Sequence, residues 1–250
     1  MHYFIGNRSC VCHSTPPPSG KIYNHYRFIN ITPLSVFVKA QIAVCLLQST
    51  VLVLPASADI DLLRRIYKTA KESEKSQRNM CALQLLMLTC ARPKNVRFAK
   101  WEEFRLERKV WLTPSKRKEK QADHVIHLSR QALELLDRIK KLNLAPEDSP
   151  YLFPAGDNNV LPDTAFASAM KTMDVGSDTQ TAFGMRYSAE AIMKNEFRPK
   201  EITIKDVTVV VKIFLDAVTS DGKPQYPPEI FMKQRAELAQ WWADKLEDIV

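Results

Sequence analysis

The segment MCALQLLMLTCARPKNV (residues 80–96) joins an apolar helix to an arginine-proline turn. Residues 80–88 are apolar nearly all round a helix, which is typical of a helix buried inside a sizeable core. Pro93 is expected to end or bend this helix, because proline lacks the backbone N–H that a helix interior uses. Arg92 is therefore predicted at the turn after a core helix, where a charged side chain is costly unless it meets an anionic partner.

Helical periodicity continues on both sides of this segment. A helix is predicted from Asp59, with Leu62, Leu63 and Ile66 on its apolar face. The other predicted helices cover residues 80–88, 96–104, 129–142, 163–173, 185–195 and 229–246. Ser129 is a plausible N-cap, and residues 109–113 and 125–128 are predicted strands. The order indicates a mostly helical α+β domain with a small antiparallel β-hairpin.

Bulk composition is that of a globular protein with a basic excess. The 250 residues are 45% hydrophobic and 26% charged, and the formal net charge is +8. This charge favours a polyanionic partner, although many basic proteins bind no nucleic acid. The five cysteines form an odd set, and the spacing of Cys10 and Cys12 is too short for a zinc knuckle, so we expect reduced thiols and no metal.

Residues 1–55 differ from the rest and show no pattern of an independent domain, whereas residues 56–250 are predicted to form the functional domain. The apolar run at residues 40–54 contains several polar side chains and is shorter than the ~20 residues that a spanning helix needs. The N-terminus lacks the basic-then-apolar order of a signal peptide. We therefore expect a soluble cytoplasmic protein with no membrane partner.

Two arginines and a tyrosine carry the candidate chemistry: Arg92, Arg186 in TAFGMR, and Tyr226. The guanidinium fork matches phosphate oxygens and stays charged, so two arginines can stabilise the charge that builds on a phosphodiester under attack. Tyrosine can be the covalent nucleophile. These groups are the parts needed to attack a phosphodiester without a metal. On local grounds alone, Arg186 could instead pair with Glu190, and Tyr226 could be an ordinary loop aromatic.

Several short blocks give the chain a family resemblance. They are LMLTCARPKNVRFAKW (86–101), HVIHLSRQALELL (124–136), YLFP (151–154), TAFGMR (181–186) and RAELAQWWADKL (235–246). In this order and approximate spacing, the chain resembles the tyrosine recombinases, and within them the prophage and genomic-island integrases. The resemblance implies the tyrosine-recombinase catalytic-domain fold and a site-specific recombinase that cuts and rejoins double-stranded DNA through a 3′-phosphotyrosyl intermediate.

The resemblance also assigns roles to residues. Arg92 and Arg186 would be the two catalytic arginines, Tyr226 the nucleophile and Lys118 the general acid of the basic hairpin tip at residues 115–121. Counting from His124 places Glu119 on the lysine position, between Lys118 and Lys120. The residues expected to contact DNA phosphates are Lys94, Arg97, Lys116, Arg117 and Lys120. No metal, nucleotide cofactor or small-molecule substrate is implied, and relatives act as homo-oligomers on DNA.

The sequence departs from the family pattern at several catalytic positions. Asn95 stands where an acidic residue is usual, and Phe183 stands where histidine is usual. No histidine follows His127, and no tryptophan lies between Arg186 and Tyr226. The alternative hypotheses are therefore a catalytically impaired DNA-binding remnant of an integrase, or a gene-decay product that barely folds. For His124 and His127 a structural role is the default, and Trp241 and Trp242 are expected to be packing anchors.

Overall fold

The computed structural model describes residues 58–114, 123–144, 149–155, 159–218, 225–227 and 229–248. These residues belong to one unit, which runs from Leu52 to Val250. The predictions for residues 1–55 and for the hairpin tip at residues 115–121 lie outside the described residues, apart from the strands that flank the tip.

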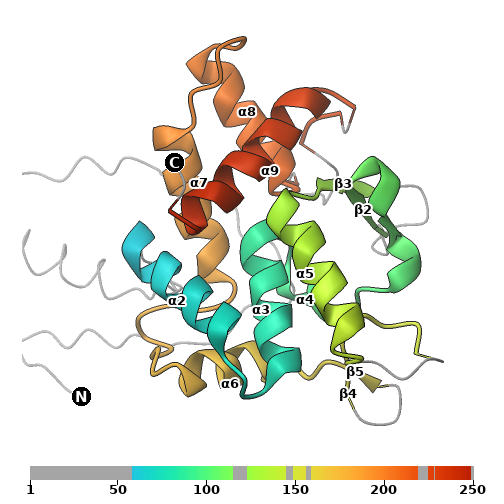
Figure 1. The fold of residues 1–250 in the computed structure, drawn as a ribbon. Helices are drawn as coiled ribbons and strands as arrows, with labels where there is room; N and C mark the ends of the chain where they lie inside the picture. The colour runs from blue at the N-terminus through green and yellow to red at the C-terminus, as the bar shows by residue number, and fades with distance from the viewer. Residues whose placement is uncertain are drawn as a thin grey trace, which may run out of the picture. The chain divides into compact units, whose positions relative to one another are not determined.

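The described chain is mostly helical, with short strands, as the α+β prediction requires (Figure 1). In chain order its helices are α2 (Ile60–Glu72), α3 (Gln77–Thr89), α4 (Pro93–Arg97), α5 (Arg130–Lys141), α6 (Ala165–Thr172), α7 (Gly184–Glu196), α8 (Ile204–Phe214) and α9 (Met232–Leu246). The 3-10 turns are η1 (Trp101–Glu103) and η2 (Leu106–Arg108). The strands are β1 (Phe104–Arg105), β2 (Val110–Thr113), β3 (His124–His127), β4 (Pro154–Ala155) and β5 (Asn159–Val160).

Helix α3 forms the centre of the core, as its apolar pattern predicts. Every residue from Met80 to Thr89 is buried, and α2, α5, α6 and α9 all pack against it (Figure 1). The amide in this buried stretch, Gln84, donates to the carbonyl oxygen of Ala70 at 2.8 Å and so joins α3 to α2. Because a buried amide without a partner would destabilise the core, this bond makes the polar residue tolerable there.

The predicted hairpin strands are confirmed, and a third strand extends them. Strands β1, β2 and β3 form an antiparallel sheet in that order, with Trp111 opposite Ile126. The Trp111 ring is fully buried and stacks on Phe104 with centroids 5.1 Å apart. Its indole N–H donates to Glu103 at 3.0 Å, so this large side chain leaves no buried donor unsatisfied.

The prediction of a continuous helix over residues 96–104 is wrong. Helix α4 begins at Pro93 and ends at Arg97, and the chain then crosses to the loop around Tyr151. Backbone hydrogen bonds join the Leu152 amide to the Ala99 carbonyl at 2.7 Å and the Trp101 amide to the Pro150 carbonyl at 3.2 Å. These long-range bonds replace the bonds that a longer helix would have made, so tertiary structure overrides the local periodicity.

Helix α8 was not predicted from the sequence. Its run of β-branched residues from Val207 to Val211 favours strands on intrinsic grounds. The helix nevertheless forms, because Thr203 and Asp206 make a reciprocal capping box and the apolar face packs on α7 and α9. The capping box is a signal that the sequence did contain.

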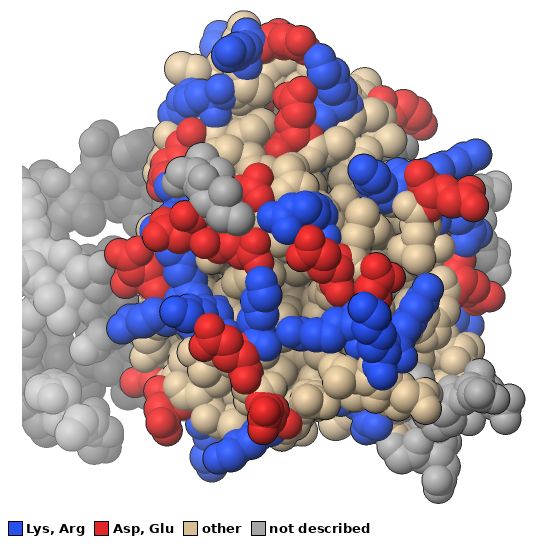
Figure 2. Space-filling view, in the orientation of Figure 1, with Lys and Arg blue, Asp and Glu red and all other residues tan. Residues whose placement is uncertain are grey.

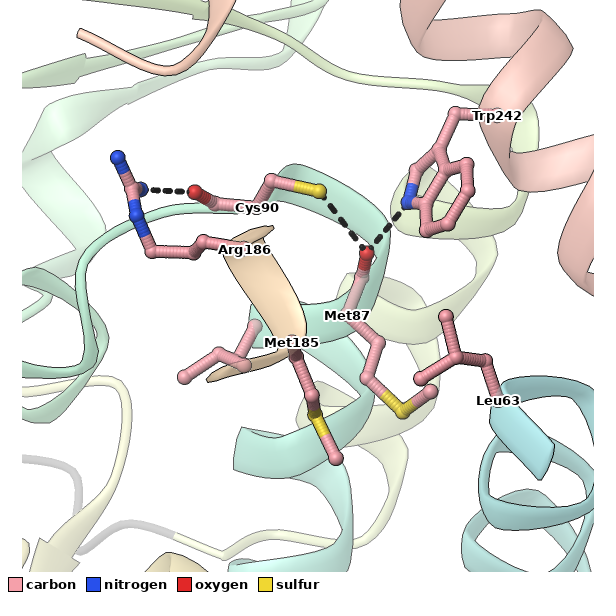
Figure 3. A pocket seen from close by; sticks show the side chains of 7 residues that line it. Leu63, Met87, Cys90, Met185, Arg186 and Trp242 are labelled. Atoms are coloured by element: carbon pink, nitrogen blue, oxygen red, sulfur yellow. Dashed lines mark hydrogen bonds between the residues drawn. The ribbon is translucent and has the colours of Figure 1, made fainter. Parts of the chain in front are cut away.

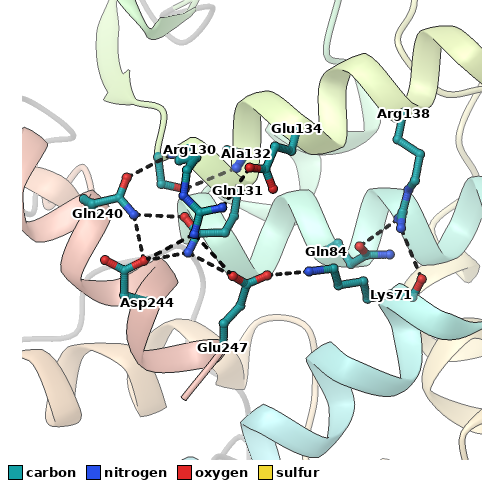
Figure 4. A network of polar contacts seen from close by, with 11 residues as sticks. Lys71, Gln84, Arg130, Gln131, Ala132, Glu134, Arg138, Gln240, Asp244 and Glu247 are labelled. Carbon is teal, nitrogen blue, oxygen red and sulfur yellow. Dashed lines mark hydrogen bonds and ion pairs between the residues drawn. The ribbon is translucent and has the colours of Figure 1, made fainter. Parts of the chain in front are cut away.

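A polar network fastens the last helix to the rest of the fold (Figure 4). Gln131 at the start of α5 donates to Asp244 of α9 at 2.7 Å, and Lys71 of α2 pairs with Glu247 at 2.6 Å. On the other side of the network, Arg138 donates to Gln84 at 2.8 Å. The network therefore connects α2, α3, α5 and α9 at one end of the core.

Opposite charges alternate over the face of the molecule shown in Figure 2. Basic and acidic side chains are interspersed there. Arg130 and Glu134 form one exposed ion pair of the fold, at 2.7 Å. This face is not a continuous basic patch. Among the helices that the structure describes, none is long and apolar enough to cross a bilayer.

Candidate active site

Arg92 is positioned by the turn that ends the core helix. Helix α3 stops at Thr89, Cys90 adopts a left-handed conformation with φ 48°, and Arg92 is the N-cap residue of α4 with Pro93 at its first turn. The missing N–H of a proline costs nothing at that position. The Arg92 guanidinium forms an ion pair with the carboxylate of Asp216, and its Nη2 donates to the Asp216 carbonyl oxygen at 2.6 Å.

Arg186 lies in the first turn of α7 and points toward the same turn. Its guanidinium donates to the backbone carbonyls of Cys90 and Leu215. Burial lowers the pKa of Arg186 from its usual value, and the neighbouring Cys90, Tyr187 and Glu190 partly oppose that shift. The local alternative, an ion pair with Glu190, is not what forms, because Glu190 pairs with Lys194.

The two arginines share a pocket. Its wall consists of Cys90, Ala91, Arg92, Asn95, His124, Ile126, Arg186, Phe214, Leu215 and Asp216. Residues from α3, α4, β3, α7 and the end of α8 thus meet at one place. Guanidiniums from distant parts of the sequence converge there, which is the arrangement needed to hold the oxygens of one phosphate.

His124 contributes a neutral imidazole to this pocket. Burial, together with the positive charges of Arg235, Arg92 and Arg186, lowers the pKa of His124 to about 3, although a hydrogen bond to the Phe214 backbone raises it. The nearest Asp216 oxygen stands 3.9 Å from Nδ1, which is too far for a hydrogen bond. The arginines outweigh that carboxylate, so His124 is uncharged near pH 7.

Arg235 of α9 is a fully buried cation behind β3. Its side chain donates to the Val125 carbonyl and contacts the Met232 sulfur at 3.2 Å. Burial lowers the pKa of Arg235 to about 10, so the guanidinium stays charged at neutral pH. The positive charge of Arg235 adds to those of Arg92 and Arg186. Burial, and to a smaller extent the charge of Arg235, lowers the pKa of His127 to about 4.

Both histidines should make the fold sensitive to mild acid. In the unfolded chain histidine has a pKa near ~6.5, so the unfolded state binds more protons than the native state as the pH falls. The stability present above pH ~6.5 is therefore lost progressively toward pH 4, by up to about 1.4 kcal/mol per pH unit for each histidine. Urea unfolding between pH 5 and 8 measures this slope.

A His124→Gln variant is the control for this pH dependence. It keeps a polar side chain but removes one titrating group, so the slope between pH 5 and 6.5 should fall by about half. An unchanged slope in this variant would show that other groups control acid stability.

An apolar chamber supports the stem of Arg186 (Figure 3). It is lined by Leu63, Leu86, Met87, Cys90, Met185, Arg186 and Trp242. The Met87 carbonyl accepts the Trp242 indole N–H at 2.8 Å and the Cys90 thiol at 3.6 Å. Burial raises the pKa of Cys90 to about 12, so this cysteine is an unreactive thiol whose part is to pack behind the arginine.

The tyrosine expected to be the nucleophile lies in a short described stretch near the pocket. Tyr226 is half-buried, and the amide of the preceding Gln225 donates to the Ala217 carbonyl at 3.0 Å. This bond brings the backbone before Tyr226 next to Asp216. Among the described residues, Tyr226 itself is not part of the pocket wall, so its place in the chemistry stays a prediction.

Phe183 and Asn95, two of the departures from the family pattern, lie close to the arginines. Asn95 is in the pocket wall, and its backbone N–H donates to the Arg92 carbonyl at 2.8 Å. Phe183 precedes α7, is 41% exposed and contacts the Tyr187 ring edge-on at 5.5 Å. A phenyl ring at this position exchanges no proton, so the site lacks the acid-base group that a histidine would supply.

The predicted phosphate contacts have different surroundings. Arg97 forms an ion pair with Asp163 and donates to the Leu161 carbonyl at 2.6 Å, so it holds α4 to the segment before α6. Lys94 is exposed, with its ammonium 6.0 Å from the Phe98 ring centroid. The hairpin residues Lys116, Arg117, Lys118 and Lys120 lie outside the described residues. In the parts that the structure describes, no group of three or more His, Cys, Asp or Glu could hold a metal ion.

Comparison with known proteins decides the family. Residues 59–203, more than half of the chain, match the sequence model of the phage integrase family. The chain belongs to the phage integrase family. The match covers α2 through α7, and therefore both arginines of the pocket in this integrase-family chain.

Individual proteins are also similar to the chain. The integrase-family chain is 25% identical over 186 residues to the prophage integrase IntA of Escherichia coli (strain K12), covering 74% of this chain and 42% of IntA. It is 27% identical over 190 residues to the integrase of Enterobacteria phage P4, covering 66% of this chain and 39% of that integrase. A crystal structure of XerA recombinase is also similar, with 14% identity, a TM-score of 0.47, and coverage of 70% of this chain and 63% of XerA. The chain spans about two fifths of the length of the two curated relatives.

Three residues of the site were not identified from the sequence of this integrase-family chain. They are Asp216, which pairs with Arg92, His124, which lines the pocket, and Arg235, which lies buried behind it. His124 and Arg235 fall inside the segments that carried the resemblance, so that signal was available. Asp216 carries no local signal, because its role depends only on a contact with a residue far away in the chain.

Proposed function

We propose that this chain carries the catalytic part of a site-specific DNA recombinase that cuts and rejoins double-stranded DNA. The observation that carries the proposal is the convergence of Arg92 and Arg186 on one pocket in a phage integrase family chain. Both guanidiniums are held in place by backbone carbonyls before any substrate arrives. Preorganised donors of this kind stabilise developing charge without a reorganisation cost at the moment of reaction.

The proposed reaction is a transesterification at phosphorus. The Tyr226 hydroxyl gives its proton to solvent water and its oxygen bonds to the scissile phosphorus, while the bond between phosphorus and the 5′ oxygen breaks. Lys118 is the proposed donor of the proton that the departing 5′ oxygen takes up. The resulting 3′-phosphotyrosyl ester retains the phosphodiester energy, so a 5′-hydroxyl of another strand can reverse the step. This scheme uses no metal, cofactor or small-molecule substrate.

The same proposal extends to partners and context. The partner is double-stranded DNA, with Lys94, Arg97, Lys116, Arg117 and Lys120 as contacts to backbone phosphates, and the chain acts as a homo-oligomer on that DNA. Residues 56–250 form the catalytic domain. The biological setting is DNA integration by a prophage or genomic island in the cytoplasm, which is supported by the similarity to the two curated integrases.

A second candidate function follows from Phe183 and Asn95. Each positioned acid-base group typically contributes ~10²–10⁴ to the rate, so a site without them could bind DNA and turn over very little. Under this alternative the chain is a DNA-binding remnant of an integrase. It predicts salt-sensitive DNA binding without any covalent product.

Covalent trapping separates the two candidates. The chain is mixed with a library of nicked duplexes whose sequence is randomised around the nick, so that the cleaved end diffuses away and the phosphotyrosyl product persists. We expect an SDS-resistant protein–DNA adduct that is absent in Tyr226→Phe, because the phenyl ring has no oxygen to attack with.

Tyr187→Phe is the matched control for this experiment. Tyr187 is exposed, adjacent to Arg186 and therefore the obvious competing nucleophile among the described residues. Its variant should keep the adduct. An adduct that survives Tyr226→Phe and disappears in Tyr187→Phe would move the nucleophile to α7, and no adduct with any variant would favour the binding remnant.

A further inference from the structure

The last turn of α8 lies inside the arginine pocket. Three successive residues at this turn are bonded by three different pocket side chains. His124 is hydrogen-bonded to the Phe214 backbone, Arg186 donates to the Leu215 carbonyl and Arg92 donates to the Asp216 carbonyl. Because the His124 bond favours the charged imidazole, His124 is its donor and the Phe214 carbonyl accepts.

The carbonyl oxygens at this turn present negative charge to the side chains around them. The final carbonyls of a helix have no partner within the helix, and together they carry about half a negative charge. The Asp216 carboxylate adds a full charge at the same point, in an ion pair with Arg92. Carboxylates and carbonyls accept from the same guanidinium N–H groups that phosphate oxygens would use.

The conformation and exposure of Asp216 suit it to accept hydrogen bonds from the Arg92 guanidinium reversibly. It has φ 51°, a left-handed conformation that aspartate tolerates better than most residues. Its side chain is 23% exposed and that of Arg92 is 19% exposed, so the pair is shielded but not sealed from solvent. A pair of this kind can open, whereas a fully buried pair would be held closed by the cost of desolvated charges.

We propose that the turn Leu215–Asp216 is an internal ligand of the arginine pocket, with Asp216 as its charged member, and that a DNA phosphate binds by displacing it. This inference rests on the proposed role of the pocket in holding a DNA phosphate. Arg92 and Arg186 have their donors on the turn in this structure, so phosphate and turn compete for the same N–H groups. Asp216 therefore lowers the affinity of the pocket for phosphate.

The same turn is linked to the segment of the proposed nucleophile. The Ala217 carbonyl accepts the Gln225 amide at 3.0 Å, one residue before Tyr226. When a phosphate displaces Leu215 and Asp216, the neighbouring Ala217 carbonyl moves with them and its hydrogen bond to the Gln225 amide breaks. Occupation of the pocket and release of the backbone before Tyr226 are thus coupled, so the tyrosine segment is freed only when a phosphate is bound.

The first test compares two variants that each remove one aspartate charge. Asp216→Asn keeps the size of the side chain and its tolerance of the left-handed conformation. Asp61→Asn removes the carboxylate that pairs with Arg64 on α2, away from the pocket and from the proposed phosphate contacts, and so controls for the change in net charge. The Kd for a fluorescent 30-base-pair duplex, measured by anisotropy at fixed salt, should fall about tenfold in Asp216→Asn and less than about twofold in Asp61→Asn.

The gain must pass through Arg92. In an Arg92→Ala background, Asp216→Asn should leave the Kd unchanged, because the competing donor is gone. Equal effects of the two aspartate variants, or a gain that persists without Arg92, would overturn the inference. Inorganic phosphate, read by the rise in melting temperature that it causes, should follow the same order of variants.

Hydrogen exchange on the unmodified chain tests the displacement without any substitution that could change the fold. Adding the duplex should accelerate exchange of the Leu215, Ala217 and Gln225 amides while the core helix α3 stays protected. Unchanged or greater protection of these amides would overturn the displacement. The result is independent of strand transfer: a tighter Asp216→Asn variant that forms no adduct would support this inference while rejecting recombinase activity.

Discussion

Replacing Phe183 with histidine is expected to speed formation of the covalent protein–DNA adduct about a hundredfold. Phe183 is solvent-exposed and lies three residues before Arg186, which places the two residues on the same side of the first turn of α7. An imidazole there can donate to a phosphate oxygen or exchange a proton, and a phenyl ring can do neither. The rate is measured as SDS-resistant adduct against time on nicked duplexes.

Phe183→Gln is the control for that substitution. Glutamine is polar and removes the same exposed aromatic surface, but it does not titrate. If both variants gain equally, the effect comes from relieving the contact with Tyr187 and not from proton transfer. If neither gains, the loss of activity lies elsewhere in the pocket, at Asn95 or at the turn that carries Asp216.

Replacing Trp242 with alanine is expected to lower the free energy of unfolding by about 4 kcal/mol. Its indole is almost fully buried between α9 and α3, and its N–H bond to the Met87 carbonyl would be lost with the ring. Most domains have a total stability of only ~5–15 kcal/mol, so this one substitution should bring the chain near its unfolding threshold. The shift of the urea midpoint at constant m-value measures it.

Trp241→Ala is the matched comparison. Trp241 is half-buried and contacts Phe197 with centroids 5.5 Å apart, so its removal should cost about half as much. Similar costs for the two tryptophans would show that the apolar chamber behind Arg186 is not the anchor of α9. A loss of DNA affinity in Trp241→Ala without a loss of stability would instead indicate that this ring contacts the nucleic acid.

Two opposing demands meet at the arginine pocket. Arg92 and Arg186 need acceptors in the folded chain, since buried guanidiniums without partners would destabilise it. The turn after α8 supplies those acceptors, and Asp216 supplies the counter-charge. The contact that stabilises the fold is therefore also the contact that a phosphate has to replace.

Local patterns in the sequence were sufficient for much of the fold. The all-round apolar helix around Leu86, the Ser129 cap and the strands of the hairpin were all predicted close to where they lie. Each depends on residues within one element, and the chemistry of those residues is readable from spacing alone. The prediction was wrong at residues 96–104, where backbone hydrogen bonds to a distant loop end the helix. It also missed α8, because the β-branched run favours a strand although a capping box precedes it.

The sequence by itself determined the family resemblance, through short blocks in a fixed order. It also determined the burial of the core helix, through its periodicity, and the position of Arg92 at the turn after that helix, through the geometry of Pro93. Only the tertiary structure decided that Arg92 meets Asp216, that Arg186 binds the end of α8 and that His124 is neutral. These facts depend on burial and on charges from elements far apart in the chain. Such contacts leave no local pattern, because each partner alone is an ordinary polar residue.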